Sequence, residues 1–280
     1  MSNFLIRTLT GICIVVFVIG GIGIHPLSFY FTVMIMLSGT QYEYYRIIQN
    51  TGVKPRIGAG LTAGIVMYTV STIIAAGLVT GKAYLVLVPF ILLIMLLELY
   101  SNQERPFDNL AHTFFPLIYT ALPFSMFPFL AFHQAGFDSL LAHPALSFSP
   151  AIVLGFFLLL WTNDTGAYLS GITLGKHKLF ERISPKKTWE GFAGGLIFTV
   201  AVAWLFSGML GTLSATGWMI VAVIISVSGT YGDLIESMLK RSAGVKDSGS
   251  IMPGHGGFLD RFDSVIISFP LVYLYITLFG

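Results

Sequence analysis

The chain has 280 residues, of which 55% are hydrophobic and 10% are charged, and its formal net charge is +2. An ordinary soluble domain carries about 25% charged residues, so this composition excludes a water-soluble globule and favours a protein whose solvent is mostly lipid. The small net charge argues against nucleic-acid binding, and the single cysteine, Cys13, excludes an intramolecular disulfide.

Apolar segments long enough to cross a bilayer recur along the whole chain. The first segment follows Arg7 and has the character of a signal peptide. It lacks a small-x-small cleavage site before His25, so we interpret it as a span. The sequence predicts an all-α polytopic membrane protein with about nine transmembrane helices. We expect them near 8–24, 27–45, 57–80, 83–99, 109–132, 149–170, 191–210, 217–236 and 262–279.

The connections between these segments are too short for a soluble domain, and the sequence contains no visible internal repeat. We therefore predict a single membrane domain over residues 1–280. Within it, residues 149–280 carry the motifs described below, whereas residues 1–148 are characterised only by their hydropathy.

The charged residues gather at one predicted face of the membrane. With nine spans, 14 of the 15 Lys and Arg residues fall on the side of the N-terminus, and only Lys82 falls on the other. The positive-inside rule then places the N-terminus in the cytoplasm and the C-terminus outside. The acids are equally one-sided, with only Asp138 outside. Because a carboxylate at membrane depth is costly unless it meets a cation or water, this pattern predicts a polar pocket open to the cytoplasm. For Glu98 and Glu104 we prefer simple solvation at a helix end.

Two pairs of carboxylates bracket a polar segment near the C-terminus. Asp233 and Glu236 are three residues apart on one predicted helix, and Asp260 and Asp263 are three apart on the last one. The segment between them contains several cations and the glycine-rich turn 253–257. Mg²⁺ is typically held by one or two carboxylates and phosphate oxygens, and Lys and Arg take up the remaining phosphate charge. The pattern predicts a magnesium–nucleotide site, with an intramembrane salt-bridge cluster as the alternative.

The order of residues in this segment resembles the signature of the phosphatidate cytidylyltransferases, also called CDP-diacylglycerol synthases. The matching positions are Ser237, Leu239, Lys240, Arg241, Lys246, Asp247, Gly249, 253–258 and 260–263. Met252 departs from the family pattern, in which Leu, Ile or Phe is expected, but it is also apolar. The resemblance extends upstream to 164–168, 175–177 and 184–191, so it covers roughly the C-terminal half specifically and the N-terminal half only by hydropathy.

The resemblance implies an enzyme that transfers a cytidylyl group from CTP to phosphatidic acid, giving CDP-diacylglycerol and pyrophosphate. It implies a requirement for Mg²⁺ or another divalent cation, with Asp233 and Asp260 as the metal ligands. The implied catalytic residues are Lys240, Arg241, Lys246, Asp247, His255, Arg261 and Asp263. The implied substrate-binding residues are Asp164, Lys176, Ser184, Lys186, Lys187, Thr188, Glu190, Ser237, Gly256 and Gly257.

The resemblance also implies a setting and a mechanism. The partners would be CTP, phosphatidic acid and membrane lipids but no nucleic acid, at the cytoplasmic side of a bacterial inner membrane; a homodimer is left open. Because the lipid phosphate is already anionic at neutral pH, we expect direct displacement, with His255 as the one credible nucleophile for a covalent route.

Two alternatives come from other classes of protein. A secondary transporter would place its carboxylates near the membrane midplane in two related halves, which the one-sided charges do not favour. A different CTP-using lipid enzyme, such as a lipid-alcohol kinase or an archaeal ether-lipid counterpart, would share much of the site. The glycine–histidine signature favours the diacyl enzyme, but the sequence does not define the acceptor.

Overall fold

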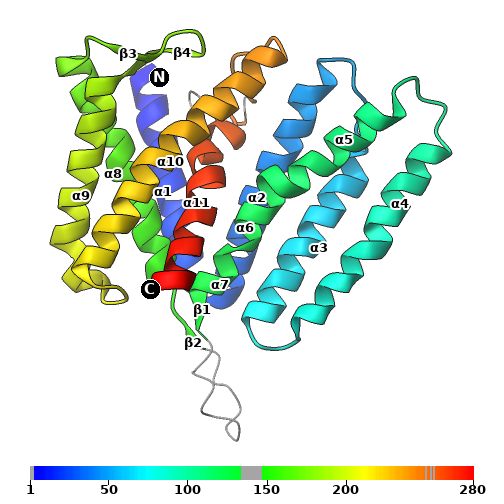
Figure 1. Cartoon of the computed structure of the whole chain (residues 1–280), viewed down its shortest axis with the longest axis horizontal. Helices are drawn as coiled ribbons and strands as arrows, with labels where there is room; N and C mark the ends of the chain where they lie inside the picture. Colours follow the sequence, from blue (N-terminus) through cyan, green and yellow to red (C-terminus); the bar gives the residue numbers. More distant parts are fainter. Residues whose placement is uncertain (1–2, 134–146, 250, 253, 255) are drawn as a thin grey trace, which may run out of the picture. The chain divides into compact units, whose positions relative to one another are not determined.

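The computed structural model describes residues 3–133, 147–249, 251–252, 254 and 256–280 (Figure 1). The chain divides into two compact units. Unit 1 consists of Met1–Pro150 and Ala243–Phe262, and unit 2 consists of Ala151–Ser242 and Asp263–Gly280. The prediction of one membrane domain over the whole chain stays a prediction.

Unit 1 is a group of helices that follow one another along the chain. They are α1 (Asn3–Gly23), α2 (Pro26–Gln49), α3 (Ile57–Ala75), the 3₁₀ helix η1 (Gly81–Val86), α4 (Leu87–Leu99), α5 (Pro106–Pro116), the π segment η2 (Leu117–Ala121), α6 (Leu122–Ser125) and α7 (Phe127–Ala131). A short antiparallel pair of strands follows, β1 (Phe132–His133) and β2 (Ser147–Phe148).

Local sequence explains where these helices begin and break. His25 caps α2, because its Nδ1 accepts from the Leu27 N–H at 3.1 Å while its own N–H donates to Ser28 Oγ, and Pro26 occupies the first turn. The predicted span 109–132 is not one regular helix, since Pro116 cannot donate a backbone hydrogen bond and the π segment η2 follows it directly.

Unit 2 is built on a hairpin of two long helices, α8 (Ala151–Leu174) and α9 (Trp189–Leu210), joined by the strands β3 (Lys178–Phe180) and β4 (Ser184–Thr188). Figure 1 shows the β3–β4 hairpin at the end where α8 stops and α9 starts. The two helices approach closely because small residues meet. A Cβ on Gly194 would lie 1.9 Å from Ser170 Oγ, and one on Gly195 would lie 3.0 Å from the Asn163 carbonyl oxygen. The unit is completed by α10 (Ala215–Ser242) and by α11 (Leu259–Phe279) from Asp263 onward.

Seven helical segments in the described part of the chain are long and apolar enough to cross a membrane. They are 57–75, 81–99, 106–131, 151–174, 189–209, 215–242 and 259–279, and a shorter apolar helix covers 8–23. In the segment 81–99 only 11% of the most apolar window is buried, which is expected where apolar side chains face lipid. The protein is therefore an all-α polytopic membrane protein. Each predicted span falls on a helix or a run of helices, while the exact number of spans and the orientation of the termini stay predictions.

Candidate active site

The signature segment of unit 1 folds around the carboxylate of Asp260. Asp260 Oδ2 accepts from the backbone N–H of Ser248 at 3.0 Å, from the N–H of Gly257 at 2.9 Å and from Ser248 Oγ at 2.8 Å. Gly256 has a φ of +79°, and a Cβ there would lie 2.3 Å from the same oxygen. A glycine is therefore required at 256 both for its conformation and for the approach to Asp260.

A carboxylate that was not among the predicted site residues also contacts this segment. Glu43, near the end of α2, accepts from Ser248 Oγ at 2.7 Å and from the Leu259 N–H at 2.9 Å, and it is only 2% exposed. The sequence offered one signal, a carboxylate inside an apolar span, but nothing that linked it to a serine 205 positions later. His255, a candidate nucleophile, lies outside the described residues.

In unit 2 the structure brings four predicted site residues together. Lys187 Nζ, from β4, lies 2.7 Å from Asp233 Oδ2 on α10 and donates to the Thr230 carbonyl at 3.4 Å. Asp263, which is 9% exposed, interacts electrostatically with Asp233, Asp164 and Lys187. The cluster thus combines carboxylates from α8, α10 and α11 with one lysine.

The predicted cations differ in how they are engaged. Lys240 pairs with Glu236 one turn earlier on α10 at 2.7 Å, and Glu236 is 1% exposed. The other signature cations have exposed side chains that a phosphate could reach; they are Arg241, Lys246 and Arg261. Asp247 is also exposed, and Ser237 donates to Asp233 Oδ1 at 3.3 Å.

Two predicted substrate-binding residues of unit 2 hold the β3–β4 hairpin in shape. Thr188 caps α9 by accepting from the Gly191 N–H at 3.1 Å. Glu190 accepts from the N–H groups of Lys176 at 3.1 Å and His177 at 3.2 Å, and lies 2.6 Å from His177 Nδ1. Lys176 and Lys186 are exposed on the hairpin, and Ser184 is half-buried in β4.

The carboxylates suit a hard cation that is shared with a substrate. Within the described ranges, no three His, Cys, Asp or Glu side chains converge closely enough to hold a metal ion by themselves. Mg²⁺ usually takes one or two protein carboxylates and completes its shell with phosphate oxygens and water. Asp233 is suited to such a role because its side chain is 36% exposed and the Asp263 carboxylate lies within electrostatic reach of it.

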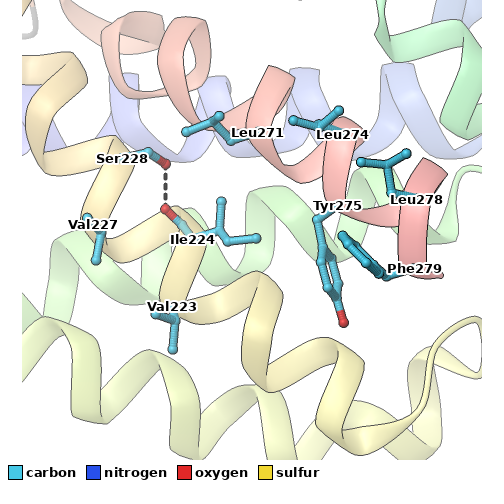
Figure 2. A pocket seen from close by; sticks show the side chains of 9 residues that line it. All are labelled: Val223, Ile224, Val227, Ser228, Leu271, Leu274, Tyr275, Leu278 and Phe279. Atoms are coloured by element: carbon cyan, nitrogen blue, oxygen red, sulfur yellow. Dashed lines mark hydrogen bonds between the residues drawn. The ribbon is translucent and has the colours of Figure 1, made fainter.

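Unit 2 also contains an apolar pocket of about 450 Å³. Figure 2 shows its walls, with side chains of α10 on one side and of α11 on the other; they are Val223, Ile224, Val227, Ser228, Leu271, Leu274, Tyr275, Leu278 and Phe279. The Ser228 hydroxyl donates to the Ile224 carbonyl of its own helix and so adds no free polar group. The pocket therefore suits a hydrocarbon chain.

One interpretation of the sequence was wrong. Glu98 is not solvated at a helix end but is 1% exposed, with Arg56 Nε at 2.7 Å from Oε2 and Asn109 Nδ2 at 2.7 Å from Oε1. Apolar surroundings make such a charge tolerable only when it is paired, and Arg56 supplies the pair. Glu104 is exposed, as expected.

Comparison with known proteins gives matches along the chain. The family model described as "Cytidylyltransferase family" matches residues 5–279. A phosphatidate cytidylyltransferase of Staphylococcus epidermidis is 41% identical over 172 residues, which cover 58% of this chain and 66% of the relative. Proteins of the same name from Bacillus subtilis and Staphylococcus haemolyticus are 45% identical over 124 residues and 50% identical over 121 residues. Those two alignments cover 44% and 43% of this chain, and each covers 46% of the relative. The matched part of this chain thus spans just under two thirds of the first relative and about half of the other two.

Proposed function

Since the chain belongs to the cytidylyltransferase family, we propose that it transfers a cytidylyl group from CTP to phosphatidic acid, releasing CDP-diacylglycerol and pyrophosphate. The observation that carries this proposal is the 41–50% identity to relatives named phosphatidate cytidylyltransferase. The clusters around Asp233 and Asp260 support it, because they combine carboxylates, cations and glycine backbone as a nucleotide triphosphate requires.

The cation would be held by Asp233 and Asp260, with phosphate oxygens of CTP as further ligands. Both carboxylates offer hard oxygen atoms, which Mg²⁺ prefers. When bound, such a cation supplies neutralisation of the triphosphate charge, worth several kcal/mol in related reactions. Asp263 interacts electrostatically with both Asp233 and Asp164, so a cation bound at Asp233 would also reduce the repulsion between these carboxylates.

The reaction would be a direct displacement. An oxygen of the lipid phosphate forms a bond to the α-phosphorus of CTP, and the bond from that phosphorus to the bridging oxygen breaks. The electron pair of the broken bond departs with pyrophosphate, whose charge the exposed side chains of Lys246, Arg241 and Arg261 are suited to take up. Orientation and charge neutralisation supply most of what phosphoryl-type transfer requires.

The lipid acceptor is supported by the apolar pocket between α10 and α11. The same two helices carry Asp233, on α10, and Asp263, on α11, at the ends away from Tyr275 and Phe279. The apolar pocket and the polar cluster therefore occur on one pair of helices. One acyl chain would lie against this surface while the phosphate is held among the charges. The one-sided charge of the sequence supports a site at the cytoplasmic face of the inner membrane.

An assay of the purified chain with CTP, phosphatidic acid and Mg²⁺ tests the proposal, with the Bacillus subtilis relative assayed in parallel. We expect CDP-diacylglycerol and pyrophosphate in equal amounts, and neither product when EDTA removes the divalent cation. Absence of product where the relative is active would overturn the proposal. In a parallel assay that supplies diacylglycerol in place of phosphatidic acid, formation of phosphatidic acid at the expense of CTP would support a lipid-alcohol kinase instead.

Isotope exchange tests the direct displacement. Labelled pyrophosphate is mixed with CTP and enzyme in the absence of phosphatidic acid, and we expect no label in CTP because CTP is not cleaved before the lipid attacks. Exchange that disappears in a His255→Ala variant would contradict direct displacement and indicate a covalent intermediate on His255.

A further inference from the structure

Glu43 is a buried carboxylate that the proposed reaction leaves without a role. It lies on α2, far from the signature in sequence, yet its Oε2 accepts from Ser248 Oγ and from the N–H of Leu259, the first residue of α11. All three residues belong to unit 1. Glu43 thus binds both ends of the segment between Ser248 and Leu259.

The Ser248 hydroxyl connects Glu43 to Asp260. Ser248 Oγ is 2.7 Å from Glu43 Oε2 and 2.8 Å from Asp260 Oδ2, and it also lies 3.3 Å from the Asp260 N–H, which donates to it. A hydroxyl has a single proton, so it can donate fully to only one of the two carboxylates at a time. The position of Asp260 is therefore coupled to that of Glu43 through one side chain.

The glycines of the signature fit against the Glu43 carboxylate. A Cβ on Gly249 would lie 2.6 Å from Glu43 Oε1, and a Cβ on Gly257 would lie 2.1 Å from Oε2. Glu43 cannot simply swing away, because doing so would break two buried hydrogen bonds. A physical reason for glycine at both positions is the close approach of the backbone to this carboxylate.

A second contact between α2 and the signature lies one helical turn earlier. A Cβ on Gly39 would lie 2.6 Å from the ring of Phe258, so this ring packs directly on the α2 backbone. Gly39 and Glu43 are four residues apart and share one face of α2. This face of α2 therefore receives the signature segment through an apolar and a polar contact.

Stability alone does not account for a carboxylate in this place. Glu43 Oε1 has no hydrogen-bond partner among the described residues, and no ion pair with Glu43 is found among them. Burying a charged group without a cation costs free energy, so a residue selected only for stability would be apolar here. Groups of this kind that persist in a fold commonly serve to orient functional residues.

We propose that Glu43 is a positioning residue, whose buried carboxylate holds the 248–260 segment through Ser248 and Leu259 and thereby fixes the orientation of Asp260. The inference rests on the proposed function, in which Asp260 is a ligand of the divalent cation. Glu43 itself touches neither the cation nor the substrates. It acts on them only through the geometry of Asp260.

The test compares Glu43→Ala with Glu43→Gln, and uses Glu98→Gln as the matched control for changing a buried carboxylate of the same unit. Three quantities are measured: the Mg²⁺ concentration for half-maximal activity, binding of Mn²⁺ by electron paramagnetic resonance, and hydrogen exchange of the backbone amides in 243–262. Loss of an outer residue that orients a ligand typically lowers metal affinity by about 10-fold or more.

We expect Glu43→Ala to raise the Mg²⁺ concentration for half-maximal activity and the Kd for Mn²⁺ by about 10-fold each. Hydrogen exchange at the backbone amides of Ser248 and Leu259 should become faster. Glu43→Gln keeps an oxygen acceptor and should restore most of the affinity and of the protection. Glu98→Gln should leave the cation affinity and the protection from exchange unchanged. Unaltered Mn²⁺ binding and exchange in Glu43→Ala would overturn the proposal, and so would equal shifts in Glu98→Gln. If Glu43→Ala does not accumulate in the membrane, Ser248→Ala, which removes only the connecting hydroxyl, is judged by the same criteria.

A double-mutant cycle separates this contact from others made by the glycines. Where Glu43 is present, Gly249→Ala should weaken Mn²⁺ binding, because its Cβ meets Glu43 Oε1. In the Glu43→Ala background the same change should lower the Mn²⁺ affinity little further. Additive effects would contradict the contact. Asp260→Asn distinguishes the two proposals: full activity in that variant removes the metal assignment, whereas an inactive Asp260→Asn beside an unaffected Glu43→Ala removes only the role of Glu43.

Discussion

Two buried carboxylates of unit 1 occupy similar places but have different surroundings. Glu98 and Glu43 lie near the C-terminal ends of α4 and α2 and are 1% and 2% exposed. Glu98 has a partner at each oxygen, and its charge is neutralised by Arg56. Glu43 receives two donors on Oε2, while Oε1 has no hydrogen-bond partner among the described residues.

The difference indicates what each carboxylate contributes. The burial of a paired, fully hydrogen-bonded carboxylate is explained by the contacts that it makes between helices. Glu98 on α4 contacts Arg56 at the start of α3 and Asn109 on α5. An incompletely paired carboxylate carries a free-energy cost that those contacts do not offset. Its place against Ser248 and Gly257 supplies the reason, since these residues surround Asp260. The comparison predicts that substitutions near Glu43 change activity more than stability, and that the reverse holds near Glu98.

The largest effect is expected at Asp260. Asp260→Asn removes a proposed ligand and should lower turnover by about 100-fold or more, while the protein still inserts and purifies normally. The matched control is Asp108→Asn, the same change at an exposed ion pair with Arg105 in the same unit. Steady-state rates at saturating Mg²⁺ measure the effect. Near-normal turnover in Asp260→Asn would count decisively against its assignment.

Lys187 should come next. It pairs with Asp233 as Arg56 pairs with Glu98, but Asp263 also lies within electrostatic reach of it. Because a charged hydrogen bond contributes roughly 1.5–3 kcal/mol, Lys187→Met should lower kcat/KM for CTP by about 10-fold. Lys178→Met, on the neighbouring strand of the same hairpin, should change it little. An equal change in kcat/KM in the two variants would contradict a role for Lys187 in binding CTP. Lys187 would then stabilise the fold only, as Arg56 does.

Hydropathy predicted the helices well because the lipid solvent imposes long apolar runs. Hydropathy does not mark their polar ends: the predicted spans end at 45 and 236, whereas α2 and α10 continue as helices to Gln49 and Ser242. The last turns of both helices carry charged residues, and a hydropathy pattern detects only the part of a helix that lies in the apolar layer. The prolines from Pro116 onward indicate an interrupted helix, but a prediction of spans from hydropathy does not use them.

The roles that the resemblance implied for the site residues stay predictions, whereas the local arrangement of the signature segment follows from its spacing and its glycines. The family resemblance it suggested is confirmed by the match over 5–279. Gly256, Asp260 and Ser248 lie within one short segment, so their contacts follow from local sequence. Glu43 was missed, and Glu98 was wrongly interpreted, because each depends on a contact between separate helices. No single sequence records which helix a buried carboxylate will meet.

A smaller, purely thermodynamic effect is expected at Glu98. Glu98→Gln leaves the guanidinium of Arg56 without its counter-charge, but Arg56 is 32% exposed and recovers part of its hydration. We therefore expect a loss of about 1–2 kcal/mol, well below the cost for a fully buried pair. Thermal unfolding in detergent should show it as a drop of about 2–4 °C in Tm. Arg105→Gln, at an exposed pair, should leave the Tm unchanged, and a large loss of activity in Glu98→Gln would contradict the comparison.

The smallest effect is expected at Glu190, which resembles Glu98 in how it is satisfied although it was predicted to bind substrate. Its oxygens accept from the N–H groups of Lys176 and His177 and from the His177 ring, so its contacts are those of a residue that shapes the β3–β4 hairpin. Glu190→Gln keeps one oxygen acceptor but loses the charge-assisted hydrogen bonds that a carboxylate accepts at its second oxygen. We expect the KM for CTP to rise by about 2–5-fold with little change in kcat, because a shifted hairpin misplaces Lys186 and Lys187 without removing them. Initial rates over a range of CTP concentrations separate the two constants. A fall in kcat as large as that of Asp260→Asn would show that Glu190 acts on the reacting groups and that complete hydrogen bonding does not mark a structural carboxylate in this protein.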